Sequence, residues 1–210
     1  MNPRHHPTED LLLDYATGAL AEAPSLLIAT HLTYCSACRG EVKRLEAVGG
    51  ALVEQLPATA VTTSLDSLFA RLDEPAPAES APPPVQPGYE WAPVPLRPYL
   101  PQVPWRSFLP GMTQIPLGAE GGSLRILRVQ AGRAMPKHTH NGRELTAVLK
   151  GGFSDGGKDY FPGDLAIAGD DDLHTPTAHD DGECICLYLI EGRLKLPGWL
   201  GLLLNRFIPH

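Results

Sequence analysis

The sequence contains no uninterrupted run of about 18 apolar residues, which predicts that no helix spans a membrane. Its first residues, MNPRHHPTED, lack the basic region and apolar core of a signal peptide, so export is not expected. Four cysteines in 210 residues are too few for a disulfide-rich secreted scaffold. These absences favour the cytoplasm, where paired cysteines are more often metal ligands or redox groups than structural disulfides.

Positive charge is also scarce in this chain. Lys and Arg number 17 against 24 Asp and Glu, which makes the formal net charge −7. Proteins that bind nucleic acids usually carry a basic stripe, so direct nucleic-acid binding is not expected. The acidic balance is compatible with a basic protein partner, although net charge acts mainly on solubility.

Proline and alanine dominate residues 75–98, PAPAESAPPPVQPGYEWAPVPLRP, and apolar periodicity is lacking there. Such a composition predicts an extended, semi-rigid linker. The alternative is a long loop inside one domain, but structureless stretches of this length are uncommon in compact domains. We therefore expect a helical domain over residues 1–73, a linker over 74–98 and a second domain over 99–210.

Apolar residues recur with helical spacing in the leading segment. Thr8 is suited to cap the first helix, and Glu9 and Asp10 are favourably placed in its first turn. Pro24 suits the first turn of a second helix. The pattern predicts a bundle of about four helices, over residues 8–20, 24–35, 38–56 and 64–72.

The trailing segment changes to short runs rich in β-forming residues, separated by glycine or acidic turns. Runs this short at regular spacing predict a sandwich or a small β-barrel. A terminal apolar run at residues 199–210 is expected to close the barrel or to pack against the helices. The expected strands lie within residues 123–132, 144–153, 164–169 and 183–190.

The stretch HLTYCSAC holds His31, Cys35 and Cys38, whose offsets of four and seven residues place them on one face of a helix. Zinc favours such a set of nitrogen and sulfur ligands, and a structural zinc site needs a fourth. His5 and His6 are the nearest candidates. The alternatives are free cysteines beside a surface histidine, or a thioredoxin-type pair, which the preceding helix disfavours. Whether the helix continues through Ser36 stays open.

A second candidate site lies in GRAMPKHTHNGRELTAVLKG, residues 132–151. His138 and His140 are two residues apart, so they point to the same face of a strand. Glu144 lies on the segment that follows this strand. The glycines and these three residues have the spacing of the first cupin motif, which implies a double-stranded β-helix barrel. FPGDLAIAGDDDLH resembles the second cupin motif and supplies His174.

This second motif departs from the cupin pattern, because Thr175 follows His174 where an asparagine is usual. The gap before His174 is also long, which leaves His179 as a rival ligand. The alternative for His138 and His140 is that they are solvent-exposed histidines on a loop. Three imidazoles and a carboxylate suit zinc, iron, nickel or manganese.

The whole chain resembles ChrR-type zinc-binding anti-sigma factors, in its HH pair, THLTYCSACRG, AVGGALVE, the proline-rich linker and the second metal-binding module. The resemblance implies that His6, His31, Cys35 and Cys38 bind zinc, and it favours zinc at the second site also. It implies that the helical domain inhibits an extracytoplasmic-function sigma factor. The cupin domain would sense oxidative stress, with singlet oxygen or organic hydroperoxides as inducers.

An enzyme is the competing hypothesis, because cupin dioxygenases use the same ligand set and fold alone cannot exclude that function. A dedicated oxygenase has no need of the HxxxCxxC motif, however, so the sequence favours a regulator that is not an enzyme. Cys184 and Cys186 are interpreted as buried core residues. The alternative places them near the barrel metal as oxidisable groups. Oligomeric state is not predicted.

Overall fold

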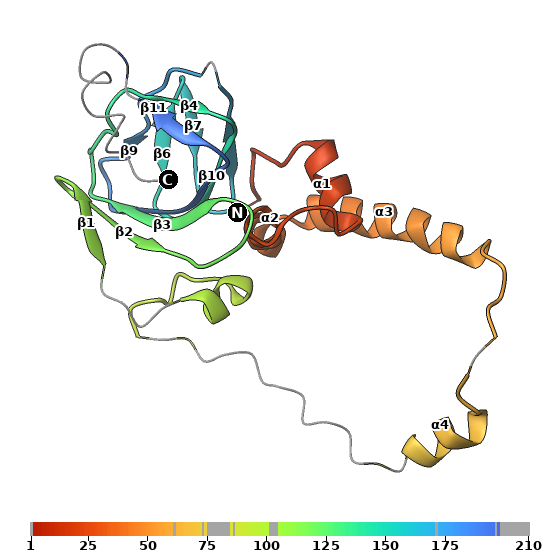
Figure 1. The fold of residues 1–210 in the computed structure, drawn as a ribbon. Helices are drawn as coiled ribbons and strands as arrows, with labels where there is room; N and C mark the ends of the chain where they lie inside the picture. The colour runs from red at the N-terminus through yellow and green to blue at the C-terminus, as the bar shows by residue number, and fades with distance from the viewer. Residues whose placement is uncertain are drawn as a thin grey trace.

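The computed structural model describes residues 2–60, 62–72, 74, 85, 87–100, 105–170, 172–195 and 197. Helices come first and strands follow, as the sequence predicts. Figure 1 shows α1, α2 and α3 grouped beside a β-barrel, with α4 standing away from both. The terminal run at residues 199–210 lies outside the described residues. None of the helices within the described ranges is long and apolar enough to cross a membrane.

The helices begin and end close to the predicted positions. Thr8 occupies the N-cap position of the first helix, although its side chain makes no capping hydrogen bond. Cys35 has an extended backbone (φ −108°, ψ 106°) and separates the second helix from the third, so the helix does not continue unbroken to Ser36. The helices are α1 (Glu9–Ala16), α2 (Glu22–Tyr34), α3 (Ser36–Glu54) and α4 (Leu65–Leu72).

The strands form a six-stranded sheet in the order β1-β2-β3-β10-β5-β8, a three-stranded sheet β7-β6-β9 and a pair β11-β4. All the pairings are antiparallel, and two isolated bridges join neighbouring segments. The strands are β1 (Arg106–Leu109), β2 (Met112–Pro116), β3 (Ser123–Val129), β4 (Thr139–Asn141), β5 (Glu144–Lys150), β6 (Phe153–Asp155), β7 (Lys158–Tyr160), β8 (Leu165–Ala168), β9 (Thr177–Ala178), β10 (Cys184–Ile190) and β11 (Arg193–Lys195).

The helix α2 lies between the other helices and the barrel. It contacts α1 and α3 as well as β5 and β10. Leu27 and Ile28 are completely buried, in a continuous core that also includes Leu145 and Leu187 of the barrel. A helix that is apolar around most of its circumference needs such cover on several sides. The two halves therefore share one hydrophobic core.

Part of the segment predicted as linker is packed against this core. Residues 94–99 form a 3-10 helix, η1 (Val94–Tyr99), in which Leu96 is fully buried. The same segment contacts α2, and the Tyr99 hydroxyl donates a 2.8 Å hydrogen bond to Glu22. An extended linker is thus an incorrect description of residues 92–98, because Ala92 and Leu96 remove apolar surface from water. The division into 1–73, 74–98 and 99–210 otherwise stays a prediction.

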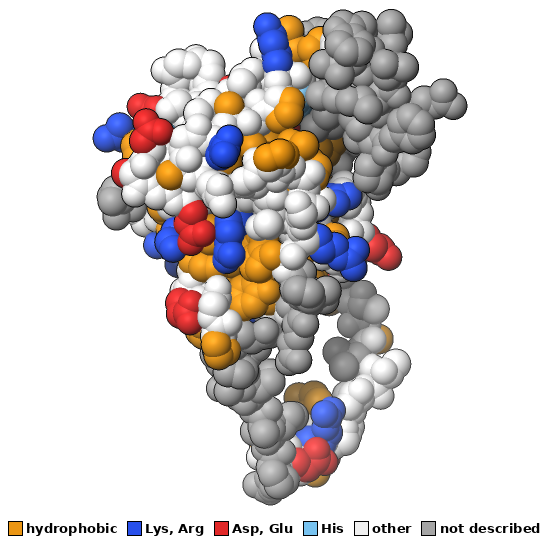
Figure 2. Space-filling model, turned by 90° about the vertical axis from the view of Figure 1, so that its left-hand side faces the viewer, with side chains coloured by type: hydrophobic (Ala, Val, Ile, Leu, Met, Phe, Trp, Pro, Cys, Tyr) orange, Lys and Arg blue, Asp and Glu red, His pale blue; other side chains and the backbone are white. Residues whose placement is uncertain are grey.

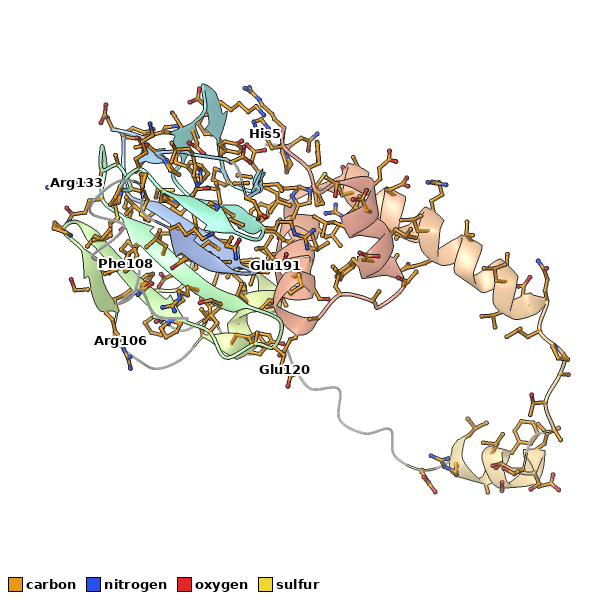
Figure 3. The ribbon with its side chains drawn as sticks, turned by 45° about the horizontal axis from the view of Figure 1, so that its top comes forward. His5, Arg106, Phe108, Glu120, Arg133 and Glu191 are labelled. Atoms are coloured by element: carbon orange, nitrogen blue, oxygen red, sulfur yellow. The ribbon has the colours of Figure 1, made fainter. Side chains whose placement is uncertain are left out.

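Backbone hydrogen bonds also join the halves at two places. At one, the Ala23 N–H donates to the Glu120 carbonyl at 2.7 Å. At the other, the Leu165 N–H donates to the His5 carbonyl at 3.0 Å. Figure 3 places His5 and Glu120 along the boundary between helices and barrel. This boundary is therefore built from specific contacts.

Charges of both signs are mixed on the barrel. On the described part of the face in Figure 2, Lys and Arg side chains lie among acidic and apolar ones and form no continuous basic stripe. Arg143 pairs with Glu191, and Lys150 pairs with Glu183, both at 2.8 Å. Acidic partners thus lie beside two of the basic side chains of the barrel.

Candidate metal centres

The break between α2 and α3 brings three predicted ligands together. His31 lies in the last turn of α2, Cys35 lies at the break, and Cys38 lies in the first turn of α3. Cys35 occupies the N-cap position of α3, and its Sγ accepts a 3.4 Å hydrogen bond from the Cys38 N–H. The ligand atoms of His6, His31, Cys35 and Cys38, here called the helical cluster, lie within 4.8 Å of one another.

Of the two N-terminal histidines, the structure brings His6 to this cluster. Its Nδ1 lies 3.4 Å from the Sγ atoms of both Cys35 and Cys38. The His5 ring instead faces the barrel, with Nε2 3.2 Å from the Asp159 carbonyl oxygen and its centroid 4.4 Å from that of Tyr160. His6 is the exposed member of the helical cluster, whereas the other three are buried.

The electrostatics of the helical cluster suit a divalent cation. Burial lowers the pKa of His31, which keeps the imidazole in the neutral form that binds metals. Burial, followed by the neighbouring Cys35 thiol, raises the pKa of Cys38 to about 12. A thiolate is therefore unfavourable here without a cation, and a bound metal would displace the thiol protons. The donor set fits a tetrahedral zinc ion with two sulfur and two nitrogen ligands.

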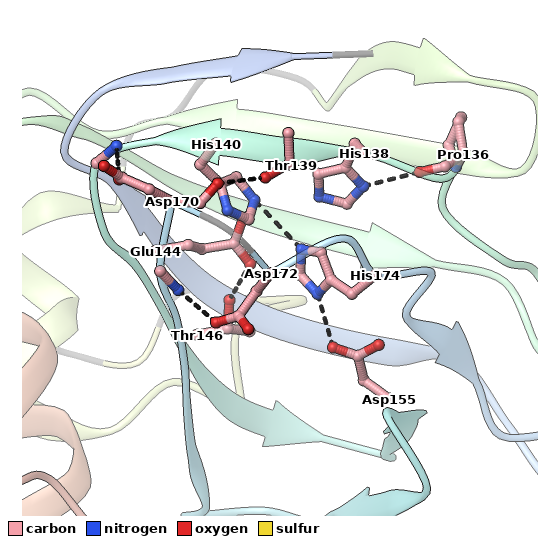
Figure 4. Close-up of polar contacts among 12 residues, drawn as sticks. Pro136, His138, Thr139, His140, Glu144, Thr146, Asp155, Asp170, Asp172 and His174 are labelled. Carbon is pink, nitrogen blue, oxygen red and sulfur yellow. Dashed lines mark hydrogen bonds and ion pairs between the residues drawn. The ribbon is translucent and has the colours of Figure 1, made fainter. Parts of the chain in front are cut away.

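The second predicted ligand set comes together inside the barrel. The ligand atoms of His138, His140, Glu144 and His174, here called the barrel cluster, lie within 4.8 Å of one another (Figure 4). His140 lies on β4 and Glu144 begins β5, while an antiparallel bridge pairs His138 with His174. His140 Nε2 lies 2.8 Å from Glu144 Oε2 and 3.3 Å from His174 Nε2.

Outer hydrogen bonds orient two of these imidazoles. His138 donates from Nδ1 to the Pro136 carbonyl at 2.7 Å, and His174 Nδ1 lies 2.6 Å from Asp155 Oδ2. In each case Nδ1 makes the outer hydrogen bond and Nε2 is available to bind a metal, as is usual for metal-binding histidines. Among the described residues, Nδ1 of His140 has no hydrogen-bond partner although it is buried. Asp155 was not predicted, because nothing in its local sequence marks it as a partner of His174.

The charge balance of the barrel cluster also fits a divalent cation. Burial lowers the pKa of His138, so this imidazole is neutral at neutral pH. Burial opposes ionisation of Glu144, but the hydrogen bond from His140 and the nearby histidines outweigh it, and its pKa is lowered. Three imidazoles around a buried carboxylate form a set that zinc, iron, nickel or manganese can occupy.

The rival ligand His179 lies away from the barrel cluster. Its Nε2 is 3.6 Å from Asp159 Oδ1, and its ring is 5.2 Å from that of Phe161. His174 meets the cluster instead because its backbone pairs with that of His138 in both directions, at 3.0 and 3.1 Å. The long gap before His174 is therefore compatible with the cluster.

An apolar cavity of about 90 Å³ opens beside the barrel cluster. His138 and Glu144 line it together with Met135, Cys184 and Cys186. The two thiols are buried and lie 3.4 Å apart. The hydrogen bond with Cys184, then burial, raises the pKa of Cys186 well above its usual value. Both interpretations of these cysteines thus have a basis, since they are core residues that also line the cavity.

Comparison with known proteins agrees with both halves of the structure. Residues 99–192 match the family described as the ChrR cupin-like domain. The chain is 40% identical to the anti-sigma-E factor ChrR of Cereibacter sphaeroides, over 99% of each protein. It also resembles a chain of the crystal structure of Rhodobacter sphaeroides SigE in complex with the anti-sigma ChrR. There the TM-score is 0.76 and the identity 39%, over 89% of this chain and 98% of that one.

These similarities extend over both clusters and over nearly the entire length, and they confirm the cupin-like fold of the second half. The chain therefore belongs to the ChrR family of anti-sigma factors.

Proposed function

We propose that this chain is a cytoplasmic anti-sigma factor that binds and inhibits an extracytoplasmic-function sigma factor. The observation that carries the proposal is the whole-length similarity to ChrR, a protein solved in complex with SigE. Residues 1–73 would bind the sigma factor, and residues 99–210 would sense the signal. Neither half would act as an enzyme.

An exposed apolar surface supports this assignment. The second half of α3 and the whole of α4 expose large hydrophobic side chains, and α4 buries none of its residues. Exposed apolar side chains that gather on a helix commonly mark a site that a partner covers. We propose that this helical surface contacts the sigma factor. It consists of Val48, Leu52, Val53, Leu56, Leu65, Leu68, Phe69 and Leu72, which are 41–76% exposed.

Zinc is the metal proposed for both clusters. In the helical cluster it would be structural, joining His6 of the N-terminal segment to the ligands of α2 and α3. Small domains of this kind commonly depend on zinc for folding, because binding free energy becomes folding free energy. In the barrel cluster a divalent ion would join β4, β5 and the segment that carries His174.

We propose that oxidative stress, such as singlet oxygen or an organic hydroperoxide, releases the sigma factor. The cavity beside the barrel cluster supports this, since Met135, Cys184 and Cys186 are oxidisable side chains that line it. Oxidation would convert an apolar lining into a polar one and change the packing around His138 and Glu144. The alternative of a dioxygenase leaves the helical cluster and the exposed helices without a role.

The proposal is tested by co-expressing the chain with each extracytoplasmic-function sigma factor of its host. We expect one of them to co-purify and to lose transcription activity in a reconstituted assay. Metal analysis of the purified chain should find two equivalents, one for each cluster. Failure to bind any of these sigma factors, or sustained turnover of diketones or thiols with iron and oxygen, would favour the enzyme.

A further inference from the structure

The turn formed by residues 161–165, here called the 161–165 turn, is a part of the barrel that contacts the helical cluster. Gly163 has a φ of +94°, and a Cβ at this position would lie 2.6 Å from Cβ of Tyr34 and 3.0 Å from Cγ of Pro3. Tyr34 ends α2 and Pro3 is buried in the N-terminal segment. A glycine is therefore required where the barrel passes between the two segments that carry the cluster ligands.

The carbonyl of this glycine orients one ligand of the helical cluster. His31 Nδ1 donates a 2.7 Å hydrogen bond to the Gly163 carbonyl oxygen, and both residues are buried. The opposite ring nitrogen, Nε2, lies 3.3 Å from Cys38 Sγ. The hydrogen bond selects the tautomer and the rotation of the ring, so that Nε2 is left to bind a metal.

The next residue, Asp164, holds the backbone that precedes a second ligand. This carboxylate is only 1% exposed, and its Oδ1 accepts hydrogen bonds from the N–H groups of Arg4 (2.5 Å) and His5 (3.0 Å). Its Oδ2 accepts from the Phe161 N–H at 2.9 Å, which also shapes the 161–165 turn. A buried carboxylate with three backbone donors is strongly localised.

The main chain completes this attachment. The Leu165 N–H donates to the His5 carbonyl at 3.0 Å, so residues 4 and 5 extend along the start of β8. His6 follows immediately, and it is the exposed ligand of the helical cluster. Its position therefore depends on a segment that is bound mainly to the barrel.

We propose that Gly163 and Asp164 are positioning residues for the metal of the helical cluster, so that the barrel supplies the outer shell of a site whose ligands all lie in the helical half. The proposal rests on the proposed function, because it requires that His6, His31, Cys35 and Cys38 bind a metal. Through these two residues the barrel controls how long that metal is retained. Loss of the outer contacts would free the exposed ligand first.

The experiment uses the full chain loaded with cobalt(II) in place of zinc. Thiolate-to-cobalt charge-transfer absorption reports the helical cluster alone, because the barrel cluster contains no thiolate ligand. A chelator is added and the decay of this absorption is followed. We expect Asp164→Ala and Gly163→Ala to lose the signal at least about tenfold faster than wild type, because loss of an outer-shell partner typically lowers metal affinity by about that factor or more.

Two matched variants control for effects on the barrel itself. Asp181→Ala removes an exposed carboxylate of the barrel, and Gly157→Ala replaces a glycine of similar φ (+78°) that has no neighbour within 4 Å. Both should release cobalt at the wild-type rate. Wild-type rates in Asp164→Ala and Gly163→Ala would overturn the inference and leave the proposed function standing. Absence of the charge-transfer band from wild type would instead overturn metal binding by the helical cluster.

A reciprocal measurement needs no change in the barrel. Coupling between two sites acts equally in both directions, so emptying the helical cluster should loosen the 161–165 turn. We expect Cys38→Ala to speed hydrogen exchange of the Leu165 amide and leave the amides of β3 unchanged. Unchanged exchange at Leu165 would contradict the inference. This test does not depend on whether Asp164→Ala or Gly163→Ala folds.

Discussion

The helical cluster and the barrel cluster each gather four ligand groups, but they are supported in different ways. The outer partners of the barrel cluster, Pro136 and Asp155, belong to the barrel itself. The outer partner of the helical cluster, Gly163, belongs to the other half of the molecule. The barrel cluster is therefore self-contained, whereas the helical cluster depends on contact between the halves. The following predictions test this difference, from the largest expected effect to the smallest.

The largest effect is expected from Cys38→Ser in the helical cluster. The substitution removes a thiolate ligand, and a structural zinc site of this kind contributes on the order of 10 kcal/mol to folding. We expect metal content to fall from two equivalents to one and sigma-factor binding to be lost, while the barrel stays folded. Metal analysis and a pull-down measure both results. Cys184→Ser, which removes a barrel thiol, is the control that should keep both metals; a Cys38→Ser protein that still recovers the sigma factor would contradict the prediction.

A large effect on binding alone is expected from the double substitution Leu68→Asp and Phe69→Asp in α4. Both side chains are exposed, so the melting temperature should change little, whereas charges placed in an apolar interface should weaken sigma-factor binding. Hot-spot residues near the centre of an interface cost about 2–4 kcal/mol each when they are truncated. Calorimetric titration measures the affinity. Leu13→Asp, at an exposed position of α1, is the matched control, and equal affinities for the two variants would place the interface elsewhere.

A moderate effect limited to the barrel is expected from Asp155→Asn. The amide retains the shape of the side chain but removes the charge that faces His174 Nδ1. Burial lowers the pKa of His174, but the Asp155 contact and nearby carboxylates outweigh it and raise the pKa. We expect metal affinity of the barrel cluster to fall about tenfold, while cobalt in the helical cluster is retained at the wild-type rate. Competition with a chelator measures both. Faster loss of cobalt from the helical cluster would contradict the view that the two clusters are supported separately.

The smallest effect is expected from Lys150→Met at the barrel surface. Lys150, together with a smaller contribution from Arg128, holds the pKa of Glu183 below its usual value. Because the pKa of Glu183 is lower in the folded than in the unfolded protein, its ion pair with Lys150 stabilises the fold above the unfolded pKa. This stabilisation is lost as the pH falls through the folded pKa. Exposed pairs of this kind contribute about 0.5 kcal/mol. The melting temperatures of wild type and Lys150→Met should differ slightly at pH 7 and converge below about pH 4. A difference that grows as the pH falls would show that the pair does not stabilise the fold.

Much of the helical cluster was predictable because its spacing is local. Offsets of four and seven residues place His31, Cys35 and Cys38 on one face of a helical segment, and the structure brings these residues together. Spacing left both His5 and His6 open as the fourth ligand. The structure places His6 in the cluster, and Asp164 binds the backbone of the two preceding residues, 4 and 5, from about 160 positions away in the sequence. The burial of Leu96 was likewise missed, because proline-rich composition predicted a linker there.

The sequence by itself determined which half is helical, four of the strands and which ligands share a face, because backbone periodicity acts over a few neighbouring residues. The shorter strands, such as β7 and β9, were not predicted. Only the tertiary structure decided that α2 is enclosed by both halves and that Gly163 accepts the His31 hydrogen bond. Contacts of this kind join residues more than 100 positions apart, and they arise from the packing of a shared apolar core. No local pattern specifies which surfaces meet, so the dependence of the helical cluster on the barrel becomes apparent only in three dimensions.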